Sequence, residues 1–409
     1  MGNSLYEIAQ LLKGNGKKVQ LIYAFNGTGK TRLSREFKSL LTQSTAENVE
    51  IEHLEVNGKK ILYYNAFTED LFYWDNDLKN DSEPKLKIHP NSFTKWIFEE
   101  QGQDRNIISN FQHYTDEKLT PHFNEYYSTK DKDGNVVKVE AFTEITFSYE
   151  RGHDERTKNI KISKGEESSF VWCVFYSLIE QVIEVLDKSE PTDKETDQFD
   201  QLGYVFIDDP VTSLDDNHLI ELAVNLASLI KSSALIDLKF IITTHNPLFY
   251  NVLFNNVLFN EFNNSDKKIG YRSDRHFKWY RLEKKEESTY ELIDRLKDSP
   301  FSYHLFLINE IEKAIDTDQL HKYHFNFLRN ILEKTATFLG YSDWSELLLP
   351  VKGNRDAYVK RILNLSSHSK HSAEEIVLLT NDDKNVLRHL MNEVNEIYRF
   401  KKFNQGGNE

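Results

Sequence analysis

The chain reads VQLIYAFNGTGKT over residues 19–31, an apolar run that leads through a glycine-rich turn into a helix-compatible stretch. A phosphate-binding loop requires this order, because its backbone N–H groups face a triphosphate from the N-terminal end of a helix. We predict that Lys30 reaches the β- and γ-phosphates and that the Thr31 hydroxyl is a ligand of Mg²⁺. The usual pattern has glycine where this chain has Ala24. The other predicted nucleotide-binding residues of the loop are Asn26, Gly27, Thr28 and Gly29.

Length and composition limit the class of protein. A chain of 409 residues can bury one large core and a second, smaller one, so we expect two domains. A single cysteine, Cys173, allows no intramolecular disulfide and favours a reducing, cytoplasmic location. No apolar run is as long as a membrane span and no signal peptide is recognisable, so no membrane association is expected.

The charge of the chain is unevenly distributed. The net charge of −14 argues against broad nonspecific nucleic-acid binding. Residues 1–290 carry −12 of it and residues 291–409 only −2, together with six of the fourteen histidines. The last part of the chain could therefore present a local basic face to RNA.

The organisation changes near residue 288. A charged stretch over residues 277–292 is typical of a hairpin or linker and is expected to end the first domain. Beyond it, residues 303–314 and 325–339 have the apolar spacing of helices. We predict an α/β domain over residues 1–288 and a mostly α-helical domain over residues 289–409.

Two carboxylates follow a second apolar run, in YVFIDD at residues 204–209. On a buried parallel strand, Asp208 would lie beside the phosphate loop and hold Mg²⁺, and Asp209 would polarise the attacking water. A third apolar run, residues 240–244, ends at His245, in the position of the switch histidine of ABC-type ATPases.

Two further motifs resemble ABC-type elements. Asp215, in SLD at residues 213–215, resembles the D-loop. The sequence SKGEE at residues 163–167 precedes an amphipathic helix expected over residues 168–186, and it resembles the LSxGE form of the ABC signature. Its predicted nucleotide-binding residues are Ser163, Gly165 and Glu166. Each motif is weak alone, but together and in this order they predict an ABC-type ATPase domain.

This class works as a pair, because the signature of one protomer contacts the γ-phosphate held by the other. We therefore expect a head-to-tail homodimer of ATPase domains, with higher assembly left open. The carboxylate after Asp208 is usually glutamate, and here it is Asp209. Residues 64–70 are the candidate Q-loop. The separation between Thr31 and Ser163, about 130 residues, is too short for the long coiled-coil arm of chromosome-maintenance ATPases.

The helical part contains a second group of residues that could act together in catalysis. Arg329 and Glu333 are one helical turn apart, which by spacing alone is an ordinary ion pair. Some 35 residues later comes NLSSHSKH, residues 364–371, which contains His368 and His371. Arginine, glutamate and histidine together can cleave RNA without a metal ion, by acid–base catalysis at the ribose 2′-hydroxyl and charge stabilisation at phosphorus.

The whole chain resembles the anticodon nucleases of the PrrC family and is more distantly similar to RloC nucleases. The resemblance is carried by YAFNGTGKTRLS (residues 23–34), FIDDPVTSLDD (206–216), ITTHNP (242–247), FSYHLF (301–306) and the Arg329, Glu333 and His368 constellation. It implies an ABC-type regulatory ATPase fused to an α-helical ribonuclease. It also implies cleavage of tRNA-Lys beside the wobble base, which leaves a 2′,3′-cyclic phosphate and a 5′-hydroxyl.

The resemblance assigns further residues and partners. The catalytic triad maps onto Arg329, Glu333 and His368, with His371 as the alternative histidine. The anticodon-recognising segment falls on Lys297, Asp298 and Ser299. The family implies hydrolysis of ATP or GTP with Mg²⁺, stabilisation by dTTP, and no metal at the nuclease site. It also implies silencing by a type I restriction–modification complex and release as an antiviral toxin during phage infection.

Two other functions compete with this interpretation. A DNA-repair ATPase of the RecF/SMC kind would use the tail only for binding or dimerisation. The soluble subunit of an ABC transporter is disfavoured by SKGEE in place of LSGGQ and by the long helical tail.

Overall fold

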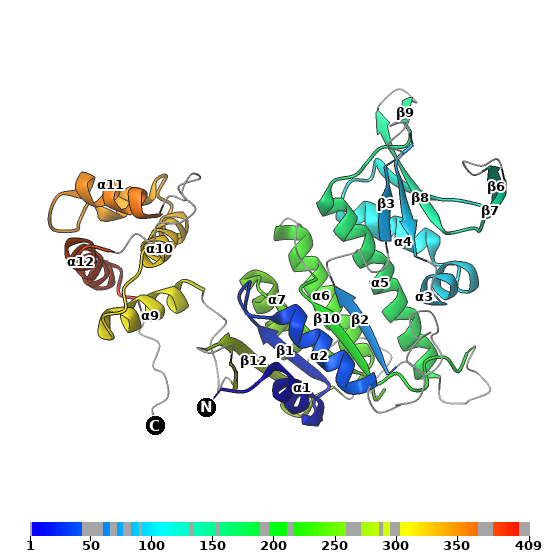
Figure 1. Ribbon diagram of the computed structural model, residues 1–409, viewed down its shortest axis with the longest axis horizontal. Helices are drawn as coiled ribbons and strands as arrows, with labels where there is room; N and C mark the ends of the chain where they lie inside the picture. Colours follow the sequence, from blue (N-terminus) through cyan, green and yellow to red (C-terminus); the bar gives the residue numbers. More distant parts are fainter. Residues whose placement is uncertain are drawn as a thin grey trace. The chain divides into compact units, whose positions relative to one another are not determined.

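The computed structural model divides the chain into two compact units, Met1–Asp298 and Ser299–Glu409 (Figure 1). The structure describes residues 2–42, 60–65, 72–76, 83–89, 92–130, 135–151, 155–188, 196–210, 216–234, 236–258, 271–285, 289–294, 303–366 and 379–400.

The first unit is built on a six-stranded sheet with the strand order β13-β12-β1-β11-β10-β2. The five strands from β12 to β2 are parallel, and β13 runs antiparallel to β12. Their bounds are β1 (Val19–Tyr23), β2 (Ile61–Asn65), β10 (Tyr204–Asp208), β11 (Lys239–Thr244), β12 (Phe277–Lys284) and β13 (Tyr290–Asp294). All five residues of β1 are buried, as expected of a parallel strand covered on both faces. Three predicted strands are confirmed: the one before the phosphate loop, the one that ends at Asp208 and the one before His245.

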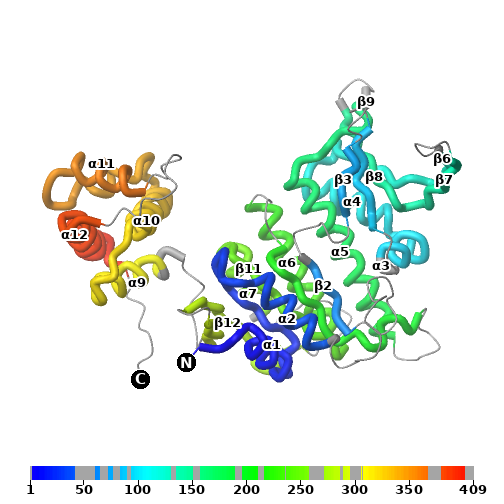
Figure 2. The backbone as a smooth tube through the Cα atoms, in the orientation of Figure 1, coloured from blue at the N-terminus to red at the C-terminus, as the bar shows by residue number. Residues whose placement is uncertain are grey.

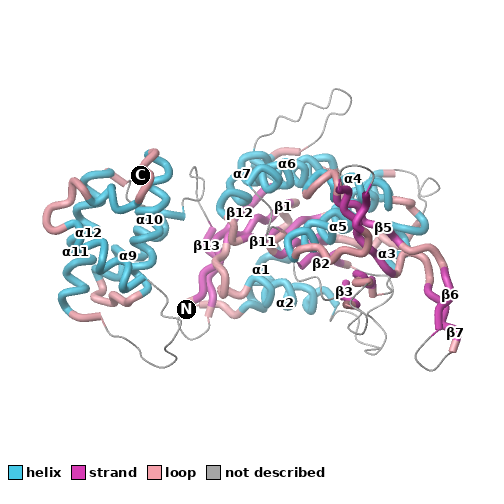
Figure 3. The backbone as a smooth tube through the Cα atoms, turned by 90° about the horizontal axis from the view of Figure 1, so that it is seen from above, coloured by secondary structure: helices cyan, strands magenta, loops and turns pink. Residues whose placement is uncertain are grey.

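Helices cover both faces of this sheet. Viewed from above, α6 and α7 lie along one face and α1 and α2 along the other (Figure 3). The core on the α1 and α2 side joins Ile8, Phe37, Phe206 and Tyr280. The bounds are α1 (Leu5–Gly14), α2 (Lys30–Thr42), α6 (Asp216–Ser232), α7 (Pro247–Leu258) and the short α8 (Ser273–His276). This arrangement places the carboxyl ends of the parallel strands and the N-terminus of α2 at one edge.

A second, antiparallel sheet was not predicted. Its order is β3-β4-β8-β5, with β9 also paired to β8, and a separate ribbon joins β6 and β7. Phe111, Phe147 and Phe170 form part of its core through mutual ring contacts. The elements are β3 (Phe72–Asp75), β4 (Lys85–Ile88), α3 (Ser92–Lys95), the π-helix η2 (Trp96–Glu100), α4 (Asp104–Tyr114), β5 (Leu119–Phe123), β6 (Tyr127–Lys130), β7 (Val136–Val139), β8 (Glu144–Arg151), β9 (Glu155–Thr157) and α5 (Lys164–Asp187).

The long helix α5 corrects one expectation. A helix was predicted over residues 168–186, and the observed one spans Lys164–Asp187 with a mean hydropathy of 1.5 in its most apolar window. By length and composition it could cross a membrane, whereas no run of that length was expected. However, 72% of that window is buried inside the unit, so packing against the second sheet and its helices accounts for its apolar surface.

The second unit consists of helices among its described residues (Figure 2). They are α9 (Tyr303–Asp316), α10 (Tyr323–Leu339), the 3-10 helix η5 (Trp344–Leu348), α11 (Arg355–Ser366) and α12 (Asn381–Tyr398). Their shared core includes Leu328, Leu332, Ile362 and Leu390. The helices predicted around residues 303–314 and 325–339 are confirmed.

The first unit ends later than the predicted residue 288. The charged stretch forms a hairpin, in which β13 pairs with β12, and Asn3 pairs with Tyr290 of β13. These backbone hydrogen bonds attach residues 290–294 to the α/β sheet, so the first unit extends to Asp298.

Candidate nucleotide and nuclease sites

The phosphate-binding loop lies between β1 and α2, as its sequence predicts. Gly27 and Gly29 have φ angles of +80° and +103°, which side-chain-bearing residues rarely adopt. Their φ angles therefore favour glycine at both positions of this turn, which leads directly into the N-terminus of α2.

The Lys30 side chain folds back over this loop. Its Nζ donates to the carbonyl oxygen of Ala24 at 3.2 Å and to Asn26 Oδ1 at 3.1 Å, and it lies 3.5 Å from Asp209 Oδ2. The side chain is only 7% exposed. An ammonium group held at a glycine-rich loop by neutral acceptors and one carboxylate is suited to binding phosphate oxygens.

Asp208 is the carboxylate at the end of β10, and it is 2% exposed. Its Oδ2 accepts a hydrogen bond from Thr31 Oγ1 at 2.7 Å, and its Oδ1 accepts one from Thr243 Oγ1 at 2.6 Å. Burial raises the pKa of Asp208 above its usual range, although both threonine hydroxyls oppose the shift. The Thr31 hydroxyl and the Asp208 carboxylate lie side by side, and Mg²⁺ prefers oxygen ligands of this kind. These residues therefore fit a Mg²⁺–nucleotide complex.

Asp209 differs from its neighbour in backbone conformation and in the direction of its pKa shift. Its φ of +53° turns the side chain toward β11, where Oδ2 lies 2.5 Å from His245 Nδ1. Burial alone would raise the pKa of Asp209, but the His245 hydrogen bond and the Lys30 charge outweigh it and the pKa is lowered. The hydrogen bond from His245 and the charge of Lys30 therefore stabilise the ionised form of the Asp209 carboxyl group.

The end of β11 is organised by ITTHNP. The Thr244 hydroxyl and the His245 N–H each donate to Asp209 Oδ1 at 3.3 Å. Asn246 Oδ1 accepts from the backbone N–H groups of Leu248 and Phe249 and so caps α7. His245 is thus held beside Asp209 by the start of the next helix.

The predicted signature residues lie at the N-terminus of α5. Ser163 is its N-cap: its Oγ accepts from the Glu166 N–H at 3.2 Å, and Glu166 Oε2 accepts from the Ser163 N–H at 2.6 Å. This capping box holds the helix end in place, and Ser163 remains exposed. Gly165 lies in the first turn. Asp215 falls outside the described residues, as do residues 66–70 of the candidate Q-loop.

The sequence interpretation did not assign Thr243 and Thr244. Each hydroxyl donates to one of the two carboxylates of the site. The available signal was the pair of threonines directly before His245, since polar residues at the end of a buried strand face the same sheet edge as Asp208.

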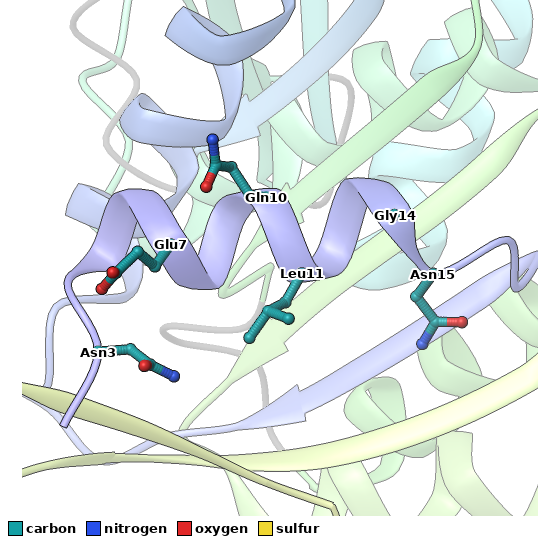
Figure 4. A pocket seen from close by; sticks show the side chains of 6 residues that line it. All are labelled: Asn3, Glu7, Gln10, Leu11, Gly14 and Asn15. Carbon is teal, nitrogen blue, oxygen red and sulfur yellow. The ribbon is translucent and has the colours of Figure 1, made fainter. Parts of the chain in front are cut away.

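A large open cavity lies elsewhere, along α1. It has a volume of about 660 Å³ and is lined by Asn3, Glu7, Gln10, Leu11, Gly14 and Asn15 (Figure 4). None of the predicted nucleotide-binding residues lines it.

In the helical unit, Arg329 and Glu333 form the predicted pair on α10. Arg329 Nε donates to Glu333 Oε1 at 2.8 Å, and a second guanidinium nitrogen donates to Ser366 Oγ at 3.4 Å. Ser366 is the last residue of α11 and the last described residue before the segment that contains His368 and His371. Those histidines lie outside the described residues, as do Lys297, Asp298 and Ser299. The pair is 36% and 44% exposed, so it is accessible to a substrate.

Fold and site together define a P-loop nucleoside-triphosphatase. A family model described as an AAA domain matches residues 141–396, more than half of the chain. The chain is also 51% identical over 415 aligned residues to the protein named "Anticodon nuclease" of Escherichia coli, with 96% of each chain covered. The chain belongs to the anticodon nuclease family.

Solved structures give weaker similarities. An Smc head bound to the C-winged helix domain of ScpA aligns with 68% of this chain and 90% of its own, at 10% identity and a TM-score of 0.30. The Smc head with a coiled coil from Pyrococcus yayanosii aligns with 48% of this chain and 27% of its own, at 11% identity and a TM-score of 0.25. TM-scores this low do not establish a common fold.

Proposed function

We propose that the chain is a nucleotide-gated anticodon nuclease that cuts tRNA-Lys beside its wobble base. As a member of its family it is an endoribonuclease with an ATPase domain and a tRNA substrate. The proposal adds the identity of the tRNA, the cleavage chemistry, the residues that perform it and the control by nucleotide. The observation that carries it is the contact of Arg329 with both Glu333 and Ser366, two residues before His368.

The cleavage is an attack by the ribose 2′-oxygen on the adjacent phosphorus. A base takes the 2′-proton, the bond to the 5′-oxygen breaks, and an acid gives that oxygen a proton, which leaves a 2′,3′-cyclic phosphate and a 5′-hydroxyl. Glu333 and His368 are the acid–base pair, with His371 as the alternative histidine, and the Arg329 guanidinium stabilises the phosphorane charge. These three groups can carry the reaction without a metal ion.

A purely structural role for Arg329 and Glu333 would contribute little. An exposed i,i+4 ion pair stabilises a helix by about 0.3–0.5 kcal/mol. Such a pair needs no third partner, whereas Arg329 also binds Ser366 at the end of a different helix. The third contact favours a site in which the guanidinium is positioned relative to the segment after Ser366.

The ATPase unit would gate the nuclease. Its Lys30 and loop N–H groups would hold the phosphates of ATP or GTP, Thr31 and Asp208 would hold Mg²⁺, and Asp209 would orient water. The exposed Ser163 at the end of α5 is available to a second protomer, so we propose a homodimer of ATPase domains in which each nucleotide is shared. Stabilisation of the active state by dTTP belongs to the same proposal.

The biological setting completes the proposal. The nuclease would be held silent in the cytoplasm by a type I restriction–modification complex and released when a phage disables that complex. Lys297, Asp298 and Ser299 would contribute to recognition of the anticodon.

The test is to map RNA ends after brief expression of the wild type and of Arg329→Ala, Glu333→Ala and His368→Ala. We expect a cut in the tRNA-Lys anticodon with a cyclic phosphate in the wild type and none in the three variants. Arg361→Ala is the matched control, because Arg361 pairs with Asp383 in the same helical unit at 3.1 Å, and it should cut normally.

Two results would refute the proposal. Intact tRNA-Lys with purified wild-type protein and nucleotide, where no masking partner is present, would favour a DNA-associated ATPase. Normal cleavage by Arg329→Ala would place the nuclease site elsewhere.

A further inference from the structure

Four rings gather around the start of α10, between two and eight residues before Arg329. The Tyr323 ring lies 4.1 Å from the His324 ring and 5.3 Å from the Phe327 ring, measured between centroids. His321 is stacked on Tyr323 at 5.5 Å with an interplanar angle of 19°. We call His321, Tyr323, His324 and Phe327 the aromatic cluster.

The cluster has a buried base and an exposed top. His324 is 3% exposed and Tyr323 is 49% exposed. Burial lowers the pKa of His324 to about 4, and the His321 N–H donates to its Nδ1 at 2.9 Å, so this ring is neutral at pH 7. Burial and the charge of Glu310 raise the pKa of Tyr323, so its phenol stays protonated. The uncharged Tyr323 ring therefore packs against the buried His324 ring and leaves much of its own surface open to solvent.

Helical geometry places the Tyr323 ring on the same stripe of α10 as Glu333. Tyr323, Asn326, Asn330 and Glu333 follow one another at spacings of three and four, which places them on one stripe of α10. Six residues of α-helix separate Tyr323 from Arg329 by about 9 Å along the axis. Leu328, Ile331 and Leu332 are fully buried and occupy the opposite side. The stripe also holds an unsatisfied acceptor, because Asn330 Oδ1 is buried without a hydrogen-bond partner in the described part of the chain.

We propose that Tyr323 is a stacking platform for an unpaired nucleobase next to the phosphodiester that is cut. Asn326 would offer its amide group to the edge of that base. Proteins read single-stranded RNA loops by stacking splayed bases on aromatic side chains and bonding their edges. This inference rests on the proposed function, since it takes the Arg329 and Glu333 pair as the cleavage site.

The alternative is that Tyr323 only covers the end of the helical core. A covering role would show as lost thermal stability with unchanged substrate affinity. A stacking role would show as weakened RNA binding with little loss of stability. Thermal stability and RNA affinity of a Tyr323 variant therefore distinguish the two roles.

The experiment measures cleavage of a tRNA-Lys anticodon stem–loop by the purified full chain with nucleotide. Loss of one stacked base weakens binding by roughly five- to 150-fold, so Tyr323→Leu should raise KM by that factor and change kcat by less than about threefold. Tyr323→Phe keeps the ring and should stay near the wild type. Tyr341→Leu is the matched control, since Tyr341 is an exposed tyrosine of the same unit (44%) that lies outside the site.

A second measurement is independent of turnover. With 2-aminopurine beside the cut site, the Arg329→Ala variant should bind the uncut stem–loop and quench the fluorescence. Adding Tyr323→Leu to that variant should abolish the quenching, and adding Tyr323→Phe should preserve it. An unchanged KM and unchanged quenching in the Tyr323→Leu variants would overturn the platform alone. Normal cleavage by Arg329→Ala would instead overturn the proposed function.

Discussion

At the scale of single residues, Asp208 and Asp209 are adjacent in sequence and opposite in environment. Asp208 is buried between two hydroxyls, and its pKa is raised. Asp209 faces His245 and Lys30, and its pKa is lowered. We propose that Asp208, which accepts from the Thr31 hydroxyl, holds Mg²⁺ and that Asp209, which lies beside Lys30 and His245, orients water.

Asp209→Asn should separate nucleotide binding from hydrolysis. Asparagine tolerates the φ of +53° at this position and keeps the shape of the side chain. Without the negative charge, hydrolysis should fall by about 10²–10⁴-fold while the nucleotide Kd changes little. Phosphate release and nucleotide titration measure the two effects, and Asp237→Asn is the exposed control. Hydrolysis near the wild-type rate would exclude Asp209 from catalysis.

Lys30→Ala tests whether nucleotide bound to the ATPase unit controls the nuclease. The change removes the ammonium group from the phosphate loop and the cation that lies 3.5 Å from Asp209. We expect nucleotide binding to weaken at least tenfold and RNA cleavage to lose its nucleotide dependence. If Lys30→Ala cut tRNA with the normal dependence on added nucleotide, the ATPase unit would not control the nuclease.

Among the secondary-structure elements, the sequence predicted the strands that are buried and are also followed by residues with a chemical role. The strands before Ala24, Asp209 and His245 were predictable because buried parallel strands are continuous apolar runs followed by polar ends. The second sheet was not, because its strands carry no motif and its core comes from residues as far apart as Phe72 and Phe170. Thr243 and Thr244 directly precede His245, but which carboxylate each hydroxyl contacts depends on the register that places β11 beside β10.

Lys18, at the start of β1, should make stability depend on pH. It is 5% exposed, its Nζ donates to the Ile236 carbonyl at 2.6 Å, and burial lowers its pKa to about 7. Because the unfolded chain keeps this proton up to about pH 10 and the folded chain releases it near pH 7, stability rises as pH increases between these values.

The measurement is the free energy of unfolding in urea from pH 6 to pH 9. The contribution of Lys18 should rise by about 2–3 kcal/mol over this range, and Lys18→Met should remove that rise. Lys17→Met is the control, because Lys17 binds the Asp274 carbonyl at the surface. Identical pH profiles for the wild type and Lys18→Met would show that Lys18 stays charged in the fold.

At the scale of the whole molecule, the proposed dimer makes each nucleotide site a joint structure of two protomers. Lys30→Ala removes the phosphate contact and leaves Ser163, whereas Ser163→Arg blocks the signature and leaves Lys30. Neither variant alone should hydrolyse nucleotide. An equimolar mixture should recover about a quarter of the wild-type rate, since half of the pairs are mixed and each mixed pair has one intact site. Failure of the mixture to recover any hydrolysis would contradict shared sites.

The pairing of β1 with β12 and of β12 with β13 also sets an order of events during synthesis. The sheet that holds the phosphate loop closes only when residues 277–294 have been made, although β1 is complete at residue 23. The helical unit, Ser299–Glu409, is translated later, and at roughly 5–20 residues per second its synthesis takes about 6–22 s. Every newly made copy therefore has a nucleotide-binding unit ready to fold before its helical unit exists.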